Sequence, residues 1–327
     1  MILVTGASGF LGKHLARRLS AQGEPVRALY HNNPPTETDK ALPNIQWQKA
    51  DLLDVFDVEE VMQGVTHIYH CAAIVSFQPS GHQQMLHFNP ESTANIVNQA
   101  IEQGITKMVY VSSVAALGRS GAVQKEITED EEWGESGYNS AYGISKYMAE
   151  TEVWRGIGEG LNAVIVNPGI ILGEGDFNEG SAELMKVAFS EFPFYTKGIN
   201  GWVDVQDVAT ILCELMRSEH EAERYIISAG NHTYYEIFTL MAQALGKKPP
   251  HIHASSFITS LIWRWGKLQS LFGKRPLVTK ETASNAHSTS LYNNKKLLSA
   301  LPSFTYTSIE ETIQRMAKSF LNVHNIK

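Results

Sequence analysis

The sequence predicts an α/β fold, in which a doubly wound parallel sheet is followed by a smaller C-terminal α+β lobe. Short apolar runs typical of buried strands alternate with segments of helical periodicity up to about residue 168. Alternating β and α segments build a parallel sheet that helices cover on both faces. Beyond that point the alternation lapses, and loops rich in Gly, Asn and Phe separate the remaining helices.

Apolar periodicity and turn residues set the expected element boundaries. The first half predicts strands at Met1–Thr5, Val26–Tyr30, Ile45–Ala50, Thr66–Ala72, Lys107–Ser113 and Asn162–Gly169, and helices at Phe10–Gln22, Val55–Gln63, Gly81–Gln103 and Ser140–Glu150. The second half predicts helices at Asp207–Ser218, His232–Leu245 and Ser308–Phe320. We therefore place a sheet domain at residues 1–168 and a substrate lobe at 169–327, with an expected strand near 223–228 as the candidate to return to the sheet.

Composition and charge exclude several classes of function. The 327 residues are 43% hydrophobic and 19% charged, which is ordinary for a folded globular protein. The net charge of −7, with no strongly basic segment, argues against a nucleic-acid partner. No leader pattern opens the chain and no apolar run reaches about eighteen residues, so we expect a cytoplasmic protein without a membrane partner. The two cysteines predict no disulfide framework.

A glycine-rich turn directly follows the first predicted strand. The segment V-T-G-A-S-G-F-L-G suits a tight turn at its first glycine, close backbone approach at its second, and tight helix packing at its third. The free N–H groups and the positive dipole end of the next helix favour a pyrophosphate. We therefore predict that a dinucleotide binds to Gly6, Ser8, Gly9, Phe10, Leu11 and Gly12.

The spacing G-x-x-G-x-x-G resembles that of the extended short-chain dehydrogenase/reductases, the NAD-dependent epimerase/dehydratase superfamily. Further segments resemble this family in order over about residues 1–230, closest in look to its dihydroflavonol reductase-like branch. One departure is Ser92, which replaces a glycine in the N-x-x-G-T-x-N pattern that begins at Asn89. The resemblance implies a Rossmann-type fold and further cofactor contacts at Asp51, Leu52, Ala72, Ala73, Asn89, Pro168 and Gly169.

The end of the second predicted strand bears on the choice of cofactor. A carboxylate there would bind the adenosine ribose and repel a 2′-phosphate, but Tyr30, His31 and Asn32 occupy this place. Members of the resembled family that use NADP often carry an arginine where His31 stands. The sequence therefore favours NADP, with NAD as the alternative if Tyr30 simply packs against the adenine.

Tyr142 and Lys146 lie one helical turn apart, so their side chains point the same way. Such a pair is by itself usually ordinary helix surface. The resemblance implies instead that Tyr142 is the proton donor, that Ser113 orients the substrate oxygen, and that Lys146 binds the nicotinamide ribose. A nearby ammonium group also favours the phenolate, which predicts a lowered pKa for Tyr142. Ser112 is the second candidate for the serine.

The same helix is apolar on a second side. Ile144, Tyr147, Met148, Thr151 and Trp154 lie largely opposite Tyr142 and Lys146. A helix that is apolar on two sides needs cover on both. We predict a homodimer through this helix, with cover by the second lobe as the alternative.

Three further features of the sequence have structural explanations. His67 and His70 point to opposite faces of a strand, so no metal site is expected. The amphipathic segment Phe257–Arg275 predicts a substrate lid or a core-facing helix in preference to a membrane-surface helix. Trp133, in an acidic loop, is expected near the site.

Three classes of function remain open. The first is an NADP-dependent reductase of a ketone or aldehyde, the second a nucleotide-sugar epimerase or dehydratase with retained NAD(P), and the third a catalytically silent binder of the cofactor. Nucleotide-sugar enzymes usually carry an arginine just before the V-x-V-x-D segment, where this chain has K-G-I-N-G-W. The sequence favours the reductase, and a less polar substrate is indicated by Phe177, Phe192, Phe194, Tyr195 and Trp202.

Overall fold

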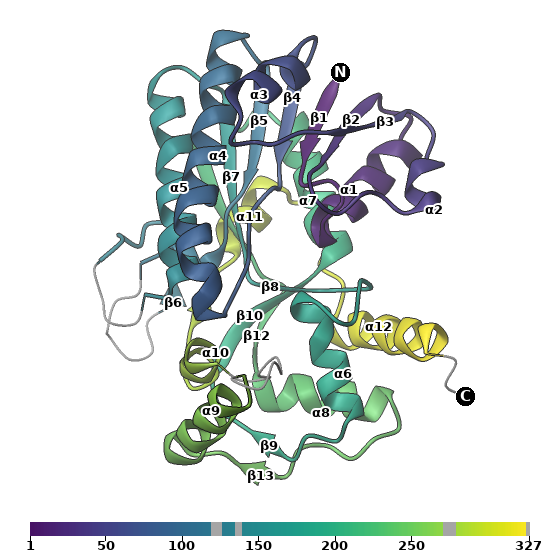
Figure 1. The fold of residues 1–327 in the computed structure, drawn as a ribbon, viewed down its shortest axis with the longest axis vertical. Coiled ribbons are helices and arrows are strands. Elements are labelled where there is room, and N and C mark those ends of the chain that lie inside the picture. The colour runs from purple at the N-terminus through teal and green to yellow at the C-terminus, as the bar shows by residue number, and fades with distance from the viewer. Residues whose placement is uncertain (119–125, 135–138, 271–278, 325–327) are drawn as a thin grey trace.

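The computed structural model describes residues 1–118, 126–134, 139–270 and 279–324, with the backbone alone at 265–270 and 280. A seven-stranded sheet forms its larger lobe (Figure 1), in the order β3-β2-β1-β4-β5-β7-β11, and every neighbouring pair is parallel. The predicted fold class is therefore confirmed. The strands are β1 Ile2–Thr5, β2 Val26–Tyr30, β3 Ile45–Lys49, β4 His67–His70, β5 Lys107–Val111, β7 Ala163–Pro168 and β11 Glu223–Ile227.

Helices cover both faces of this sheet, because its strands are apolar on both sides. One core cluster joins α1 (Phe10–Ala21) and α7 (Val205–Arg217) to Val4, Val109 and Val166. The other joins α3 (Val55–Met62), α4 (His82–Glu102) and α5 (Ala141–Gly158) to the opposite face. A short helix, α2 (Glu37–Lys40), precedes β3.

Two segments from the second half of the chain pack in the larger lobe. β11 pairs with β7 along its whole length and forms an edge of the sheet. α7, which the alternation of elements placed in the second lobe, packs against α1 because Val208, Ile211 and Leu215 are fully buried on that side. Apolar periodicity shows that a helix has a buried face, but not which neighbour covers it.

The smaller lobe is built on a three-stranded sheet of β8 (Ile170–Leu172), β10 (Ile199–Asp204) and β12 (Gly230–Thr233). Its core packs around the fully buried Trp202 and contacts α6 (Glu183–Phe189), α8 (Tyr234–Ala244) and α12 (Ile309–Val323). The remaining elements are β6 Glu126–Ile127, β9 Phe194–Tyr195, β13 Ile252–His253, α9 Ser256–Ser270, α10 Lys280–Asn285, β14 Leu291–Tyr292, α11 Lys295–Ala300 and the short 3-10 turns at Pro79–Gly81, Val114–Ala116 and Gly180–Ala182.

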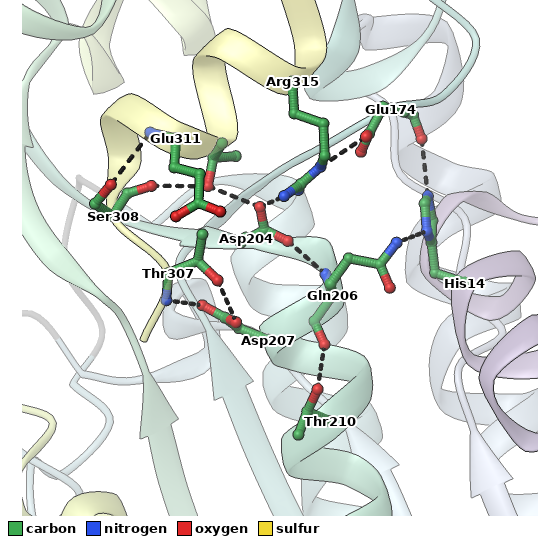
Figure 2. Close-up of polar contacts among 11 residues, drawn as sticks. His14, Glu174, Asp204, Gln206, Asp207, Thr210, Thr307, Ser308, Glu311 and Arg315 are labelled. Atoms are coloured by element: carbon green, nitrogen blue, oxygen red, sulfur yellow. Dashed lines mark hydrogen bonds and ion pairs between the residues drawn. The ribbon is translucent and has the colours of Figure 1, made fainter. Parts of the chain in front are cut away.

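A polar network fastens α12 to α1 and α7 at the junction of the two lobes (Figure 2). The fully buried Asp204 accepts hydrogen bonds from Arg315, from Thr312 Oγ1 at 2.7 Å and from Gln206 N at 2.6 Å. The Gln206 amide donates to His14 Nδ1 at 2.8 Å, so His14 Nε2 carries the proton it donates to Glu174 O at 2.8 Å. Burial lowers the pKa of His14, which keeps this imidazole neutral.

Within the described residues, no helix is long and apolar enough to cross a membrane. The described part of the amphipathic segment Phe257–Arg275 forms most of α9, which packs beside α10, whereas residues 271–275 lie outside the described ranges. Phe257 and Leu261 on α9 are exposed at 71% and 51%. The face that carries these two side chains therefore does not face a core.

Candidate functional site

The glycine turn between β1 and α1 forms a narrow backbone cradle. Gly6 has a φ of +63°, and a Cβ added there would lie 2.8 Å from the Cα of Ala72. A Cβ on Gly12 would lie 2.1 Å from the carbonyl oxygen of Gly6, closer than any real side chain. α1 begins at Phe10 with Gly9 as its N-cap and without a side-chain cap. Its first-turn N–H groups and positive dipole end fit the pyrophosphate of a dinucleotide.

This turn lies where the strand order of the sheet reverses. β1 has β2 on one side and β4 on the other, and ligands of doubly wound sheets bind outside the carboxyl ends of the strands at such a point. Ala72 follows β4 there, and its N–H donates to Thr5 Oγ1 at 3.1 Å. Both Ala72 and the neighbouring Ala73 are half-buried.

The adenosine side of the site is formed at the ends of β2 and β3. Tyr30 ends β2 and is half-buried, whereas His31 and Asn32 are exposed. The carboxylate of Asp51, just after β3, lies 3.8 Å from His31 Nε2. The adjacent Leu52 is buried, and its carbonyl oxygen accepts a hydrogen bond from Asn95. The structure therefore brings these five predicted cofactor contacts to one edge of the sheet.

Asn89 lies in the middle of α4, which begins at His82 and carries Pro90 inside it. The helix predicted at Gly81–Gln103 is therefore confirmed, and the N-x-x-G-T-x-N pattern begins inside it. The Asn89 side chain is 2% exposed and clamps the backbone of Ile74, accepting from its N–H at 2.8 Å and donating to its carbonyl at 3.0 Å. Its amide also donates to Ser145 Oγ at 3.0 Å. Asn89 thus fixes the loop after Ala73 against α5.

Ser113 and Tyr142 meet at the carboxyl end of β5. The Ser113 hydroxyl interacts with the phenol of Tyr142, which lies in the first turn of α5. α5 starts there because Ser140 caps it by accepting from Gly143 N. Burial raises the pKa of Tyr142, and the Ser113 hydroxyl opposes this effect. The phenol therefore stays protonated at neutral pH.

Lys146 is 1% exposed and directs its ammonium group at β5. Nζ donates to the hydroxyl of Tyr110 at 2.9 Å and to the carbonyl oxygen of Val111 at 2.8 Å. Burial lowers the pKa of Lys146 to about 7, against the opposing charge of Glu150. The lowered pKa that the helical spacing predicts for Tyr142 is wrong for this structure. Nζ bonds to β5, and burial dominates at the phenol.

A buried carboxylate lies one turn further along α5. Glu150 is 2% exposed and accepts from Ser112 Oγ at 2.5 Å, from Asn167 Nδ2 at 2.8 Å and from Arg224 at 3.1 Å. Ser112 therefore faces Glu150, whereas Ser113 faces Tyr142. Asn167 also donates to the carbonyl oxygen of Ser113 at 3.0 Å, which links the carboxylate to the backbone of the site.

The turn after β7 carries the last two predicted cofactor contacts, Pro168 and Gly169. Pro168 ends β7, and the N–H of Gly169 donates to the carbonyl of Ile227 at 2.9 Å. A Cβ on Gly169 would lie 2.5 Å from the carbonyl oxygen of Gly201, so only glycine lets β10 approach this closely.

The aromatic residues near the site are not those that the sequence indicates. Phe77, in the loop after Ala73, packs edge-on against Tyr142 with ring centroids 6.2 Å apart. Phe177 and Trp202 are instead buried in the core of the smaller lobe, and Phe192, Phe194 and Tyr195 lie at or beside β9. Trp133 stacks on Tyr147, on the outer side of α5, at 4.3 Å. The mostly apolar run I-V-S-F directly after Ala73 is the sequence feature that could have indicated an apolar side chain at the site, namely Phe77.

The profile of the NAD dependent epimerase/dehydratase family matches residues 2–228. The chain belongs to this family. It is therefore an NAD(P)-dependent enzyme of the extended short-chain dehydrogenase/reductase type, as the resemblance implies.

Relatives within this family include reductases and epimerases. Sterol demethylase protein B of Methylococcus capsulatus is 28% identical over 256 residues, which cover 76% of each chain. A putative dihydroflavonol 4-reductase of Synechocystis is 28% identical over 331 residues, which cover 99% of this chain and 95% of that protein. The structure of UDP-glucose 4-epimerase from Thermotoga maritima matches with a TM-score of 0.79 over 99% of both chains. At 18% identity that match shows the fold alone.

Proposed function

We propose that this family member is an NADP-dependent oxidoreductase that reduces the carbonyl group of a weakly polar ketone or aldehyde to an alcohol. The observation that carries the proposal is the contact of Ser113 with a protonated Tyr142, beside the ring of Phe77. A proton donor must hold its proton until the carbonyl oxygen becomes negative. Burial favours the neutral phenol and therefore suits Tyr142 to reduction.

The chemistry divides between the cofactor and the side chains. A nicotinamide cofactor, when bound, supplies the hydride for the carbonyl carbon. Tyr142 transfers its phenolic proton to the carbonyl oxygen, so that the C=O group gains two hydrogens and becomes an alcohol. Ser113 donates a hydrogen bond that orients this oxygen, and the Lys146 ammonium stabilises the phenolate left behind.

The proposed cofactor contacts follow the cradle and the two sheet edges. The N–H groups from Gly6 to Gly12 hold the pyrophosphate, and the segment at Asp51 and Leu52 meets the adenine. Absence of a carboxylate at the end of β2 supports NADP, with His31 and Asn32 exposed where a 2′-phosphate would lie. Ala72, Ala73, Pro168 and Gly169 line the nicotinamide half, and Asn89 shapes its loop.

An apolar substrate is supported by the surroundings of Tyr142. Phe77 is 37% exposed beside the phenol, and Val75 in the same loop is 56% exposed. A nucleotide sugar needs cations for its diphosphate and polar partners for its sugar, whereas this loop offers apolar side chains. The similarity to a sterol demethylase protein and to a putative dihydroflavonol reductase supports the same class of substrate.

A panel of substrates tests this function. The protein is incubated with NADPH and a set of apolar ketones and aldehydes, and in parallel with UDP- and dTDP-sugars. The proposal predicts net loss of NADPH with a carbonyl compound. Conversion of a nucleotide sugar without net loss of cofactor would support the epimerase or dehydratase instead.

We also propose a homodimer through α5. Tyr147 and Met148 on the outer side of this helix are exposed at 36% and 42%, beside a half-buried Trp154. Two-fold dimers are the commonest oligomers, and an apolar helix face suits their self-complementary contacts. Light scattering at micromolar concentration should give twice the monomer mass for the wild type and the monomer mass for Met148→Glu. A monomeric wild type would contradict the proposal.

We propose that the protein is located in the cytoplasm. Cys71 and Cys213 are both free thiols, as expected of a protein kept in a reducing compartment. Fractionation of the native cells with an antibody against the chain tests this location, and recovery from an oxidising compartment would contradict it.

A further inference from the structure

Behind Lys146, buried polar side chains form a continuous chain of polar contacts that ends at the phosphate-binding turn. Nζ donates to the hydroxyl of Tyr110, and this hydroxyl interacts with Thr93 on α4. Thr93 Oγ1 lies 3.1 Å from His70 Nε2, and His70 Nδ1 lies 2.7 Å from Thr5 Oγ1. All five residues are at most 1% exposed.

The count of donors and acceptors fixes the direction of each bond. Thr93 gives its one hydroxyl proton to the carbonyl oxygen of Asn89 at 2.7 Å, so it accepts from His70 and can act only as an acceptor toward Tyr110. His70 Nε2 therefore carries the imidazole proton, and Nδ1 accepts from the Thr5 hydroxyl. Burial and the charge of Lys146 lower the pKa of His70 to about 3, so the imidazole remains neutral. Every member of the chain has a partner in this assignment.

The far end of the chain touches the cradle for the cofactor. Thr5 precedes Gly6, and its Oγ1 accepts from the N–H of Ala72 at 3.1 Å. Ala72 is the residue that leaves no room for a Cβ on Gly6. The position of the Lys146 ammonium is thereby connected to the backbone that binds the phosphates.

Of the groups around the Lys146 ammonium, Tyr110 is one of the two that accept its hydrogen bonds. The Glu150 carboxylate on the same helix favours the ammonium form, and burial raises the pKa of the Cys71 thiol to about 12, so this thiol is neutral. His70 and the phenol of Tyr142 are neutral as well. An ammonium group has three N–H donors, of which Tyr110 and Val111 take two. The direction of the third N–H is therefore set by these two bonds to β5.

We propose that Tyr110 is a positioning residue, whose hydroxyl holds the Lys146 ammonium toward the cofactor and ties it through Thr93 and His70 to the phosphate-binding turn. This inference rests on the proposed function of Lys146. Tyr110 does not touch the reacting atoms. It acts by stabilising the protonated lysine in one position, so its loss changes the pH dependence of the site.

The variant Tyr110→Phe removes only the hydroxyl. Its matched control is Tyr69→Phe, which removes a 2%-exposed tyrosine hydroxyl from the neighbouring strand β4, where the ring packs in the core on the other face of the sheet. The Tyr69 hydroxyl bonds to Cys213 and does not contact Lys146. Two readouts are measured for each protein between pH 5.5 and 9. They are the affinity for NADPH from fluorescence titration, and kcat/KM.

In the wild type, we expect both quantities to fall as the pH rises and Lys146 loses its proton. Tyr110→Phe removes the acceptor of a charge-assisted hydrogen bond from Lys146. The pH at which both quantities decrease should therefore be about one unit lower in this variant. Tyr69→Phe should superimpose on the wild type. Thr93→Val removes the acceptor of the Tyr110 hydroxyl and should shift this pH in the same direction by a smaller amount. This variant replaces Tyr110→Phe in the test if Tyr110→Phe does not fold.

An NADPH-binding profile for Tyr110→Phe that coincides with that of the wild type would overturn the inference, whatever the loss of stability. The binding readout needs no turnover. If the wild type binds NADPH but reduces no carbonyl compound, the proposed function fails while the role of Tyr110 is still decided by the binding profiles.

Discussion

The Ser113 hydroxyl interacts with the phenol of Tyr142, while the neighbouring Ser112 donates to Glu150 at 2.5 Å. Both Tyr142 and Glu150 lie on α5, but adjacent residues at a strand end point in opposite directions, so only Ser113 reaches the phenol. We therefore expect Ser113 to contact the substrate and Ser112 to support the fold.

Replacement of Tyr142 by phenylalanine tests the proton donor. Tyr142→Phe should lower kcat by about 10²- to 10⁴-fold, the usual contribution of a positioned acid. The affinity for NADPH should stay close to that of the wild type, because the cradle at Gly6 is unchanged. Steady-state kinetics and fluorescence titration measure the two effects, and undiminished turnover would refute the assignment.

The two serines give a matched pair of variants. Ser113→Ala should lower kcat without a large loss of stability, because its hydroxyl faces the site. Ser112→Ala should retain kcat but lower the free energy of unfolding by about 1–3 kcal/mol, since it takes a donor from the buried Glu150 carboxylate. Urea unfolding and kinetics of both variants check this. The reverse pattern would show that Ser112 is the catalytic serine.

Cofactor preference should change with one residue at the end of β2. Tyr30→Asp places a carboxylate where the adenosine ribose is expected, which repels a 2′-phosphate and accepts from a 2′-hydroxyl. The ratio of kcat/KM for NADPH to that for NADH should fall by about tenfold or more, on the order of one lost charged contact. Tyr30→Phe is the control and should keep the ratio. An unchanged ratio in Tyr30→Asp would place the adenosine elsewhere.

Activity should depend on pH mainly through Lys146. Burial lowers its pKa to about 7, and the protonated form is the one that stabilises the phenolate. The value of kcat/KM is therefore maximal below this pH and decreases as the pH rises through it. The buried His70, with its pKa near 3, adds no second step between pH 5 and 7. A profile that rises from pH 6 to pH 8 would contradict this account.

The polar junction of the lobes should contribute to stability. Asp204→Asn weakens the bond to Arg315, which is partly exposed, and should cost about 2 kcal/mol, below the range for fully buried pairs. Lys40→Ala breaks the exposed Glu37–Lys40 pair and should cause no measurable change. Urea unfolding of both variants makes the comparison. Equal midpoints for Asp204→Asn and the wild type would contradict a structural role for the network in Figure 2.

The sequence was sufficient for features that depend on short spacings. Gly6, Gly9 and Gly12 belong to one turn, and Tyr142 and Lys146 to one helix, so their mutual geometry follows from local structure. The same holds for the alternation that predicts the sheet. These features were placed correctly because neighbours in the chain decide them.

Features that depend on distant segments were not predictable. Tyr110 and Thr93 read as ordinary core positions until β5 and α4 are packed beside Lys146. Trp202 reads as a pocket residue, although it is fully buried in the smaller lobe. β6 pairs with β14 over a separation of about 165 residues, and two-residue strands leave no periodic signal.

The stoichiometry of cofactor and product tests the central claim most directly. Purified protein is incubated with a limiting amount of NADPH and an apolar ketone from the panel, and both the alcohol and the oxidised cofactor are quantified, with Tyr142→Phe in parallel. We predict one alcohol for each NADPH oxidised by the wild type, and almost none with the variant. Turnover of a nucleotide sugar with no net oxidation of NADPH, and no alcohol from any carbonyl compound, would contradict the account.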